Sequence, residues 1–410
     1  MFEELCKISQ HFLDIKNQQF RRYFIQNIPL THRLLVIIGQ RGIGKTTTLI
    51  QYLLSQVNND RFSSDILYVQ CDHFIMGQTS LYEVAENFNA LGGKLIAFDE
   101  IHKYPNWSQE LKSIYDTFPK LKIIASGSSA LEIHKGSHDL SRRALVHRMY
   151  GLSFREYLEL YHGIKISSYS LEEILKNHER IVSNILNLTA ENDKKILPHF
   201  LDYLSHGYYP FFREVNDTAT YFLLVEQNVH AIIESDLVAI HPSLTGNSIK
   251  KIKQLLVYIS RAVPFIPNWQ KLKSILEIGD DRTLKTYLKY LEDAELIKTI
   301  QKATQKIQKI EAPEKIYLNN SNQMQALSFD QNNKGTIRET FFLNMLSTQH
   351  EVTLPIQGDF LVDDRFLFEI GGKKKGFHQL KPATNSYLAV DEIEHGIGAK
   401  IPLWLFGFLY

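Results

Sequence analysis

A glycine-rich segment holds the first residues whose types and spacing suggest chemistry. Residues 39–46 read GQRGIGKT, which fits the pattern G-x-x-x-x-G-K-[ST], and they follow the apolar run RLLVIIG. Glycines let successive backbone N–H groups turn inward at the start of a helix, where they bind phosphate oxygens. The pattern predicts that Lys45 contacts the β and γ phosphates of ATP and that Thr46 holds Mg²⁺. The predicted nucleotide-binding residues are Gly39, Gln40, Arg41, Gly42, Ile43, Gly44, Lys45, Thr46 and Thr47.

A pair of carboxylates ends a second apolar run, KLIAFDE. Here Asp99 is expected to join Thr46 in the magnesium shell, and Glu100 to orient and deprotonate the attacking water. An apolar strand ending in Asp-Glu is common at the surface of α/β proteins, but a phosphate loop upstream makes the pair informative. The two segments together predict hydrolysis of ATP, with Lys45 and Glu100 as catalytic residues.

Further candidates for catalysis lie after the fourth apolar run. Ser126 and Ser128 in ASGSSA could contact the γ-phosphate or the water, or could merely cap the next helix. Arg142 and Arg143 precede the fifth run and could supply positive charge to the transition state, within the chain or across a subunit interface. A solvated basic turn is the other interpretation of these arginines.

The elements that must position these residues alternate along the chain. Five nearly continuous apolar runs are separated by amphipathic helical segments, which is typical of a doubly wound parallel sheet covered on both faces. The runs are RLLVIIG, DILYVQCD, KLIAFDE, KLKIIASGSS and ALVHRMYGLS. The predicted fold class is therefore α/β, a P-loop sheet of the additional-strand ATPase class.

The remainder of the chain divides by its hydrophobic periodicity. Helical recurrence dominates after the fifth run, and then the order helix, helix, helix, strand, strand predicts a winged helix-turn-helix. The last residues mix helix and strand signals in a small α/β domain. The predicted parts are N-terminal helices at 1–32, the P-loop core at 33–152, a helical connector at 153–248, the winged helix at 249–327 and the α/β domain at 328–410.

Composition limits the partners and the compartment. The chain has 410 residues with 46 basic and 45 acidic side chains, so no global field attracts nucleic acid or a membrane surface. Its two cysteines, Cys6 and Cys71, fit neither a disulfide framework nor a zinc site. No signal peptide and no membrane-spanning run is evident, so a cytoplasmic protein without a membrane partner is expected.

A local basic face could still contact DNA. Arg282, Lys285 and Lys289 are spaced to share one face of the third helix in the winged-helix segment. Acidic residues follow at once, and many winged helices serve only as protein contacts. DNA binding and protein binding both remain open for this segment.

Several motifs resemble those of prokaryotic AAA-type ATPases whose C-terminal half carries a domain of uncharacterised function, often nuclease-like. They are GQRGIGKTTTLIQ, FDEIHKYPNWSQELKSIYD, ASGSSALEI, GLSFREYL and DYLSHGYYPFF, and the resemblance that they carry extends over most of the chain. The resemblance implies an ATPase core, a helical connector, a winged helix and a terminal domain with a restriction-endonuclease-like fold. It also implies a homo-oligomer, for which a ring is plausible.

The implied nuclease-like fold directs attention to three carboxylates. Such sites use two carboxylates to hold Mg²⁺ and a lysine to position the water. Asp359 and Glu369 are the predicted metal pair, and Glu339 is a further carboxylate on the preceding helix. However, Gly371 occupies the expected lysine position, and Lys373 is the nearest lysine. The prediction is a degenerate, noncatalytic domain, with a migrated lysine as the minority alternative. Its basic segment KKKGFHQLK could serve as an edge that contacts DNA.

Three roles follow from these expectations. The first is Mg²⁺-dependent ATP hydrolysis by an oligomer that remodels or moves on DNA. The second is a nucleotide switch with little turnover that binds a protein partner in signalling or defence, and the third is an ATP-regulated nuclease. Stimulation of hydrolysis by DNA would separate the first from the second.

Overall fold

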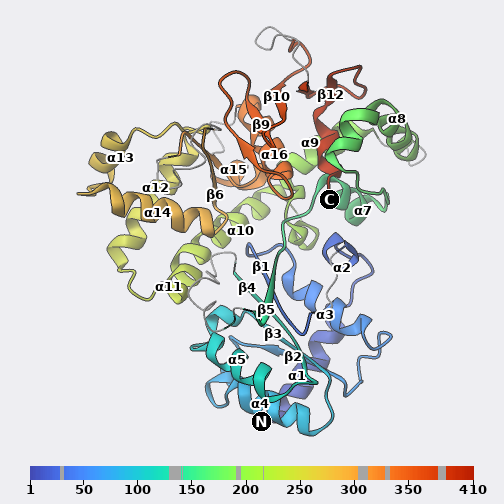
Figure 1. Ribbon diagram of the computed structural model, residues 1–410, viewed down its shortest axis with the longest axis vertical. Helices are drawn as coiled ribbons and strands as arrows, with labels where there is room; N and C mark the ends of the chain where they lie inside the picture. The colour runs from blue at the N-terminus through green and yellow to red at the C-terminus, as the bar shows by residue number, and fades with distance from the viewer. Residues whose placement is uncertain are drawn as a thin grey trace. The chain divides into compact units, whose positions relative to one another are not determined.

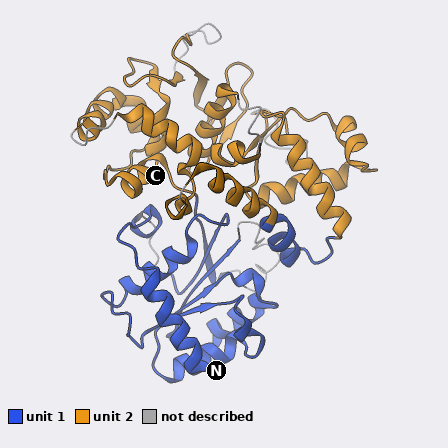
Figure 2. Cartoon of the chain, turned by 180° about the vertical axis from the view of Figure 1, so that it is seen from behind, with its two compact units in different colours: residues 1–150, 231–244 blue, residues 151–230, 245–410 orange. Residues whose placement is uncertain are grey.

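The chain forms two compact units in the computed structural model (Figure 2). Unit 1 contains residues 1–150 and 231–244, and unit 2 contains residues 151–230 and 245–410. The structure describes residues 1–27, 32–128, 140, 142–190, 195–215, 217–302, 313–327, 333–376 and 385–410.

Unit 1 is built on a parallel sheet of five strands in the order β2-β3-β4-β1-β5 (Figure 1). Each predicted apolar run contains one strand, so the predicted parallel α/β sheet is confirmed. Its strands are β1 (Leu34–Gly39), β2 (Ile66–Gln70), β3 (Leu95–Asp99), β4 (Lys122–Ser128) and β5 (Ala144–Arg148). The residues of β1 and β3 are buried throughout, as expected for strands covered on both faces.

Strand order brings the candidate residues together. Because β4 lies between β1 and β3, the segments that follow these three strands leave the sheet side by side at its carboxyl edge. Ligands of open parallel sheets bind at this edge. The glycine-rich loop after β1 and the carboxylates at the end of β3 therefore share one edge.

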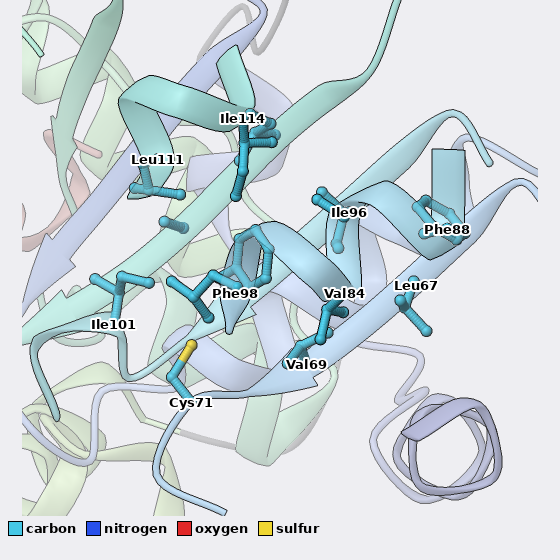
Figure 3. Close-up of a cluster of buried hydrophobic side chains, with 14 of the residues drawn as sticks. Leu67, Val69, Cys71, Val84, Phe88, Ile96, Phe98, Ile101, Leu111 and Ile114 are labelled. Carbon is cyan, nitrogen blue, oxygen red and sulfur yellow. The ribbon is translucent and has the colours of Figure 1, made fainter. Parts of the chain in front are cut away.

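Helices pack on the strands of unit 1 and bury their apolar sides. Figure 3 shows the core around Phe98, where side chains of β2 and β3 meet those of α4 and α5. Ser80 starts α4 with a capping box that uses Glu83. The helical elements of this unit are α1 (Phe2–Ile15), α2 (Tyr23–Asn27), α3 (Lys45–Ser55), η1 (Phe74–Gly77), α4 (Leu81–Ala90), η2 (Ile101–Lys103), α5 (Trp107–Thr117), η5 (Ile232–Asp236) and α11 (Leu237–Ile240).

The first part of unit 2 is helical, as the sequence predicts. Its elements are α7 (Phe154–His162), α8 (Leu171–Ala190), α9 (Ile196–Asp202), η3 (Tyr203–Gly207), η4 (Pro210–Glu214) and α10 (Thr218–Ala231). Ser153 starts α7 with a capping box completed by Glu156, which explains why LSFREY begins a helix. One segment departs from the expected grouping, since residues 231–244 were assigned to the connector and instead cluster with unit 1.

The next segment contains three helices followed by an antiparallel strand pair. They are α12 (Gly246–Ser260), α13 (Trp269–Leu276), α14 (Asp281–Asp293), β6 (Ile297–Ile300) and β7 (Lys315–Leu318). Asp280 caps α14 by accepting from the backbone N–H of Thr283, which fixes the turn that the sequence indicated. The elements thus occur in the predicted order, while their assignment as a winged helix stays a prediction.

The last part of unit 2 is a mixed sheet in the order β12-β11-β10-β9-β8. Parallel pairing joins β10 to β11 and β11 to β12, and β8 and β9 continue the sheet in antiparallel fashion. The elements are α15 (Ser321–Leu327), α16 (Lys334–Leu346), β8 (Val352–Thr353), β9 (Phe360–Val362), β10 (Phe366–Gly371), β11 (Ser386–Val390), β12 (Lys400–Pro402) and η7 (Leu403–Phe408). In the described ranges, no helix is long and apolar enough to cross a bilayer.

Candidate functional site

The glycine-rich loop joins β1 directly to α3, which begins at Lys45. Gly42 and Gly44 have φ angles of 84° and 95°, in the left-handed region that favours glycine. A side chain on Gly39 would bring its Cβ to 2.4 Å from the carbonyl oxygen of Met149. The loop therefore needs glycine at these positions and presents the N-terminus of α3, which suits an anion.

Lys45 is buried within this loop. Its Nζ donates hydrogen bonds to the carbonyl oxygens of Gly39 and Gln40, at 2.9 and 3.1 Å. These contacts hold the ammonium group against the loop that leads into α3. A phosphate placed there would meet one full positive charge together with backbone N–H groups.

Asp99 lies at the centre of a polar cluster at the sheet edge. Its Oδ2 accepts hydrogen bonds from Thr46 Oγ1 at 2.6 Å and from the Tyr68 hydroxyl at 2.7 Å. Its Oδ1 accepts from Ser126 Oγ. Carboxylate and hydroxyl oxygens are the ligands that Mg²⁺ prefers, so Thr46 and Asp99 suit such an ion. Sequence reasoning missed Tyr68, which lies inside β2 and carries no motif.

Glu100 follows Asp99 in a left-handed conformation, with φ of 54°. Burial raises the pKa of its carboxyl group, and the negative charges of Asp99 and Asp236 raise it further, against the lowering effects of Lys45 and His102. A carboxylate with a raised pKa is a better proton acceptor near neutral pH. Strain at a non-glycine residue in this region is typical of functional sites.

The two predicted serines of β4 lie at the same edge, in different roles. Ser126 contacts Asp99, and its Oγ also accepts from the backbone N–H of Glu100 at 3.3 Å. The backbone N–H of Ser128 donates to Nδ1 of His102 at 3.2 Å. Ser126 thus contacts both Asp99 and Glu100, whereas Ser128 contacts His102 in the loop that follows Glu100.

A second cluster, formed around Asp236, adjoins the carboxylate pair. This buried carboxylate lies 2.6 Å from Nζ of Lys103, 3.5 Å from Nε2 of His102 and 3.7 Å from the Arg41 guanidinium. Burial acts to raise the pKa of Asp236, but His102 and Lys103 outweigh it and hold the pKa at about 2. Sequence reasoning missed Asp236, because it is distant along the chain from the other site residues and lies in an ordinary helical pattern.

The predicted role of Arg142 and Arg143 within their own chain is not supported by their place. Arg143 immediately precedes Ala144, which pairs with Leu34 at the start of β1, whereas the glycine-rich loop follows the end of that strand. Five residue steps of about 3.3 Å each separate the two ends. The Arg143 side chain pairs instead with both carboxylate oxygens of Asp116, at 2.8 and 3.0 Å. Arg142 is exposed beside it, with φ of 68°.

The predicted DNA-contacting residues of α14 are all exposed, as one shared face requires. Two of them already have neighbours. Lys289 pairs with Asp293 at 2.6 Å, and Lys285 lies over the Trp269 ring at 5.9 Å from its centroid. Because these two lysines are engaged locally, the basic face is weaker than its sequence suggests.

The three predicted carboxylates of the terminal domain influence one another electrostatically, and the lysine beside Glu369 differs from the expected one. Asp359 Oδ2 accepts from the backbone N–H of Ile370, next to Glu369 on β10. Nζ of Lys375 lies 2.7 Å from Oε1 of the fully buried Glu369. Lys373, the lysine that the sequence suggested for this place, is exposed. The chain turns back after β10, and the side chain of Lys375, two residues after Lys373, therefore returns to the sheet.

Burial dominates the electrostatics of this acidic cluster. It raises the pKa of both Asp359 and Glu339, and the charge of Asp359 adds to the increase at Glu339. Glu339 Oε2 accepts from the Tyr317 hydroxyl at 2.6 Å. Over the described residues, however, no three His, Cys, Asp or Glu side chains are gathered closely enough to hold a metal ion. The fit of this cluster to Mg²⁺ is therefore incomplete.

Residues 31–158 match a family model described as an AAA domain, and they contain the glycine-rich loop, Asp99 and Glu100. This part of the chain is similar to an AAA domain. A second model, described only as a domain of unknown function, matches residues 197–332 and so spans parts of the predicted connector and winged helix. These matches support an AAA-type P-loop ATPase with a C-terminal domain of unknown function.

Comparison with whole proteins adds little about activity. The chain is 29% identical over 285 residues to the uncharacterized protein MJ1637 of Methanocaldococcus jannaschii, an alignment that covers 64% of this chain and 56% of the relative. The chain thus spans little more than half the length of that relative. Among solved structures, C. elegans PCH-2 is 14% identical with a TM-score of 0.26, covering 72% of this chain and 67% of that one.

Domain III of the Thermotoga maritima replication initiation protein DnaA is 17% identical to the chain, also with a TM-score of 0.26. That alignment covers 56% of this chain and 96% of the DnaA domain. Scores this low carry no argument about the arrangement of the whole chain. The AAA assignment therefore rests on the family match and on the geometry of the sheet edge.

Proposed function

We propose that the AAA domain binds ATP with Mg²⁺ at the carboxyl edge of its sheet and hydrolyses the β–γ phosphoanhydride. The observation that carries the proposal is the contact of Thr46 with Asp99, which joins the end of the glycine-rich loop to the end of β3. Glu100 directly follows Asp99, so the proposed water-activating carboxylate adjoins the end of the phosphate-binding loop.

The chain's own groups have separable roles in this proposal. Lys45 turns from the loop carbonyls to the β and γ phosphates, and the backbone N–H groups at the start of α3 bind the remaining oxygens. Mg²⁺, held through Thr46 and Asp99, would neutralise phosphate charge. Tyr68 and Ser126 keep the Asp99 carboxylate in place by donating to its two oxygens.

Glu100 accepts a proton from the attacking water. As the water oxygen bonds to the γ phosphorus, the bond from that phosphorus to the bridging oxygen breaks, and ADP leaves with its negative charge. The raised pKa of Glu100 suits this transfer. The direct test measures ATP binding and phosphate release by the purified chain, with Mg²⁺ present and after its removal by a chelator. Absence of Mg²⁺-dependent release in a protein that binds ATP would contradict the hydrolysis proposal.

For the role of hydrolysis, we propose coupling to DNA in an oligomer. The exposed residues of α14 support it, but only modestly, because Lys285 and Lys289 are engaged locally. The alternative is a slow nucleotide switch that binds a protein partner. Hydrolysis rates with single-stranded, duplex and branched DNA separate the two, since a DNA motor is stimulated and a protein-directed switch is not. Sedimentation with and without ATP tests the oligomer.

An ATP-regulated nuclease remains a second candidate because Lys375 brings an ammonium group to Glu369. That contact removes the objection that Gly371 leaves the cluster without a lysine. The incomplete gathering of metal ligands among the described residues argues the other way. We therefore derive no cleavage step for this cluster.

A further inference from the structure

Asp236 occupies an unusual place in the chain. It belongs to unit 1, yet its segment, residues 231–244, is flanked along the chain by residues 151–230 and 245–410 of unit 2. Its segment packs on unit 1 through Ile240, which contacts the apolar core. Asp236 itself is only 2% exposed, and its carboxylate faces the loop that follows Glu100. A buried carboxylate at this position needs an explanation that the AAA motifs do not give.

His102 connects Asp236 to Glu100. Its Nδ1 accepts the backbone N–H of Ser128, which leaves Nε2 as the ring nitrogen that carries a proton. That Nε2 lies 3.5 Å from Oδ1 of Asp236 and 3.6 Å from Oε2 of Glu100. Neither distance makes a full hydrogen bond, and Nε2 has no hydrogen-bond partner in the described part of the chain. One N–H therefore stands between two carboxylates and can bond well to only one of them.

We infer that Asp236 is a positioning residue for the hydrolytic step and acts through His102. When the His102 N–H bonds to Asp236, Oε2 of Glu100 stays free to accept the proton of the attacking water. Without Asp236, the remaining acceptor is Glu100, and a hydrogen bond from His102 then occupies the Oε2 that would accept the proton of the water. The inference rests on the proposed function, because it concerns the group proposed to activate water.

The ion pair of Asp236 with Lys103 provides the control. Lys103 makes its shortest ion pair, at 2.6 Å, and also donates to Ser235 Oγ at 2.6 Å. A purely structural role for Asp236 would operate through this pair. Lys103→Met breaks the ion pair, but Asp236 remains as an acceptor for the His102 N–H. Asp236→Leu removes both the ion pair and this acceptor and keeps a side chain of similar shape.

The experiment measures kcat for phosphate release and, separately, ATP affinity for the full chain and its variants. We expect Asp236→Leu to lower kcat about tenfold or more while ATP affinity changes less than about twofold, because only the water-activating step is affected. Lys103→Met should leave kcat within about twofold of the wild type. In a His102→Phe background, Asp236→Leu should have no further effect, since the N–H that it redirects is gone.

The possible failures are distinguishable. An equal loss in Lys103→Met, additive losses in the double variant, or a loss of ATP affinity in Asp236→Leu would each overturn the inference while leaving ATP hydrolysis established. If Asp236→Leu does not fold, Asp236→Asn keeps an acceptor oxygen for His102 and should retain kcat within about threefold. A larger loss in folded Asp236→Asn would also overturn it. A wild-type chain without ATPase activity would overturn the proposed function and the inference together.

Discussion

The side chain of Lys375 lies across Gly371, and its Nζ reaches 2.7 Å from Oε1 of Glu369. A Cβ added at Gly371 would meet Cγ of Lys375 at 2.5 Å, so the glycine provides the space in which this lysine lies. Gly371 thus occupies the position at which a lysine was expected, and its lack of a side chain lets Lys375 reach the carboxylate of Glu369.

The first prediction concerns this pair. Lys375→Met should lower the free energy of unfolding of unit 2 by on the order of 2 kcal/mol, because it leaves a buried carboxylate without its cation. The matched control Lys373→Met should change it by less than about 0.5 kcal/mol, since that side chain is exposed. Urea unfolding of both variants tests this, and equal effects would contradict it.

The same variants test nuclease activity. We expect no cleavage of DNA or RNA that depends on Glu369, in Mg²⁺ or Mn²⁺ with ATP present, because the described residues around it do not gather a set of metal ligands. The control is Glu369→Ala. Cleavage by the wild type that is lost in Glu369→Ala and Lys375→Met, but kept in Lys373→Met, would establish the nuclease instead.

The second prediction is that Lys45→Ala abolishes tight ATP binding and leaves the protein folded. The variant removes the one lysine ammonium that the structure places under the glycine-rich loop, and the loop keeps its glycine conformations. Titration with a fluorescent ATP analogue measures the affinity, with circular dichroism as the check on folding. Lys94→Ala, which alters an exposed pair with Asp65, is the control. Wild-type affinity in folded Lys45→Ala would refute the phosphate-loop assignment.

The third prediction separates binding from hydrolysis. Glu100→Gln should keep ATP bound while slowing phosphate release by about a hundredfold to ten-thousandfold, the usual contribution of a general base. Single-turnover measurements with saturating ATP provide the rate. A variant that turns over like the wild type would show that another group accepts the proton.

The fourth prediction tests Tyr68, which was found only in the structure. Tyr68→Phe removes the hydroxyl that donates to Oδ2 of Asp99 and leaves Thr46 as the other donor to that oxygen. Loss of such an outer contact typically weakens metal affinity tenfold or more, so the Mg²⁺ concentration for half-maximal hydrolysis should rise by about tenfold. Tyr82→Phe serves as a control in the same unit. An unchanged Mg²⁺ requirement would exclude the proposed support of Asp99.

The fifth prediction concerns the arginines. Because Arg143 is paired with Asp116 at the far end of the sheet, Arg143→Ala and Asp116→Ala should lower the melting temperature by similar small amounts and leave hydrolysis near the wild-type rate. If instead either arginine completes a neighbouring subunit's site, an inactive Arg142→Ala or Arg143→Ala protein mixed with Glu100→Gln protein should regain activity. That recovery would establish the oligomeric role that the family resemblance implies.

Local sequence patterns predicted the strands and the phosphate loop because each depends on neighbouring residues. A continuous apolar run predicts a buried strand, and the spacing of Gly39, Gly44 and Lys45 specifies a loop whose geometry is local. Side-chain partners brought together by the fold were not predictable in the same way. Asp236 reaches His102 only because a distant segment packs on unit 1, and Lys375 reaches Glu369 only because the chain reverses after β10.

Unit 1 is discontinuous, and this has a consequence for its synthesis on the ribosome. The residues of β5 emerge long before residues 231–244, since the whole of 151–230 is translated between them. Domains of a nascent chain generally fold from the N-terminus as they appear. Here the five-stranded sheet can form early, but Lys103 and His102 acquire Asp236 only after the first part of unit 2 has left the ribosome. An AAA domain cut at its family boundary, residue 158, would keep the glycine-rich loop and both carboxylates and yet never receive this partner.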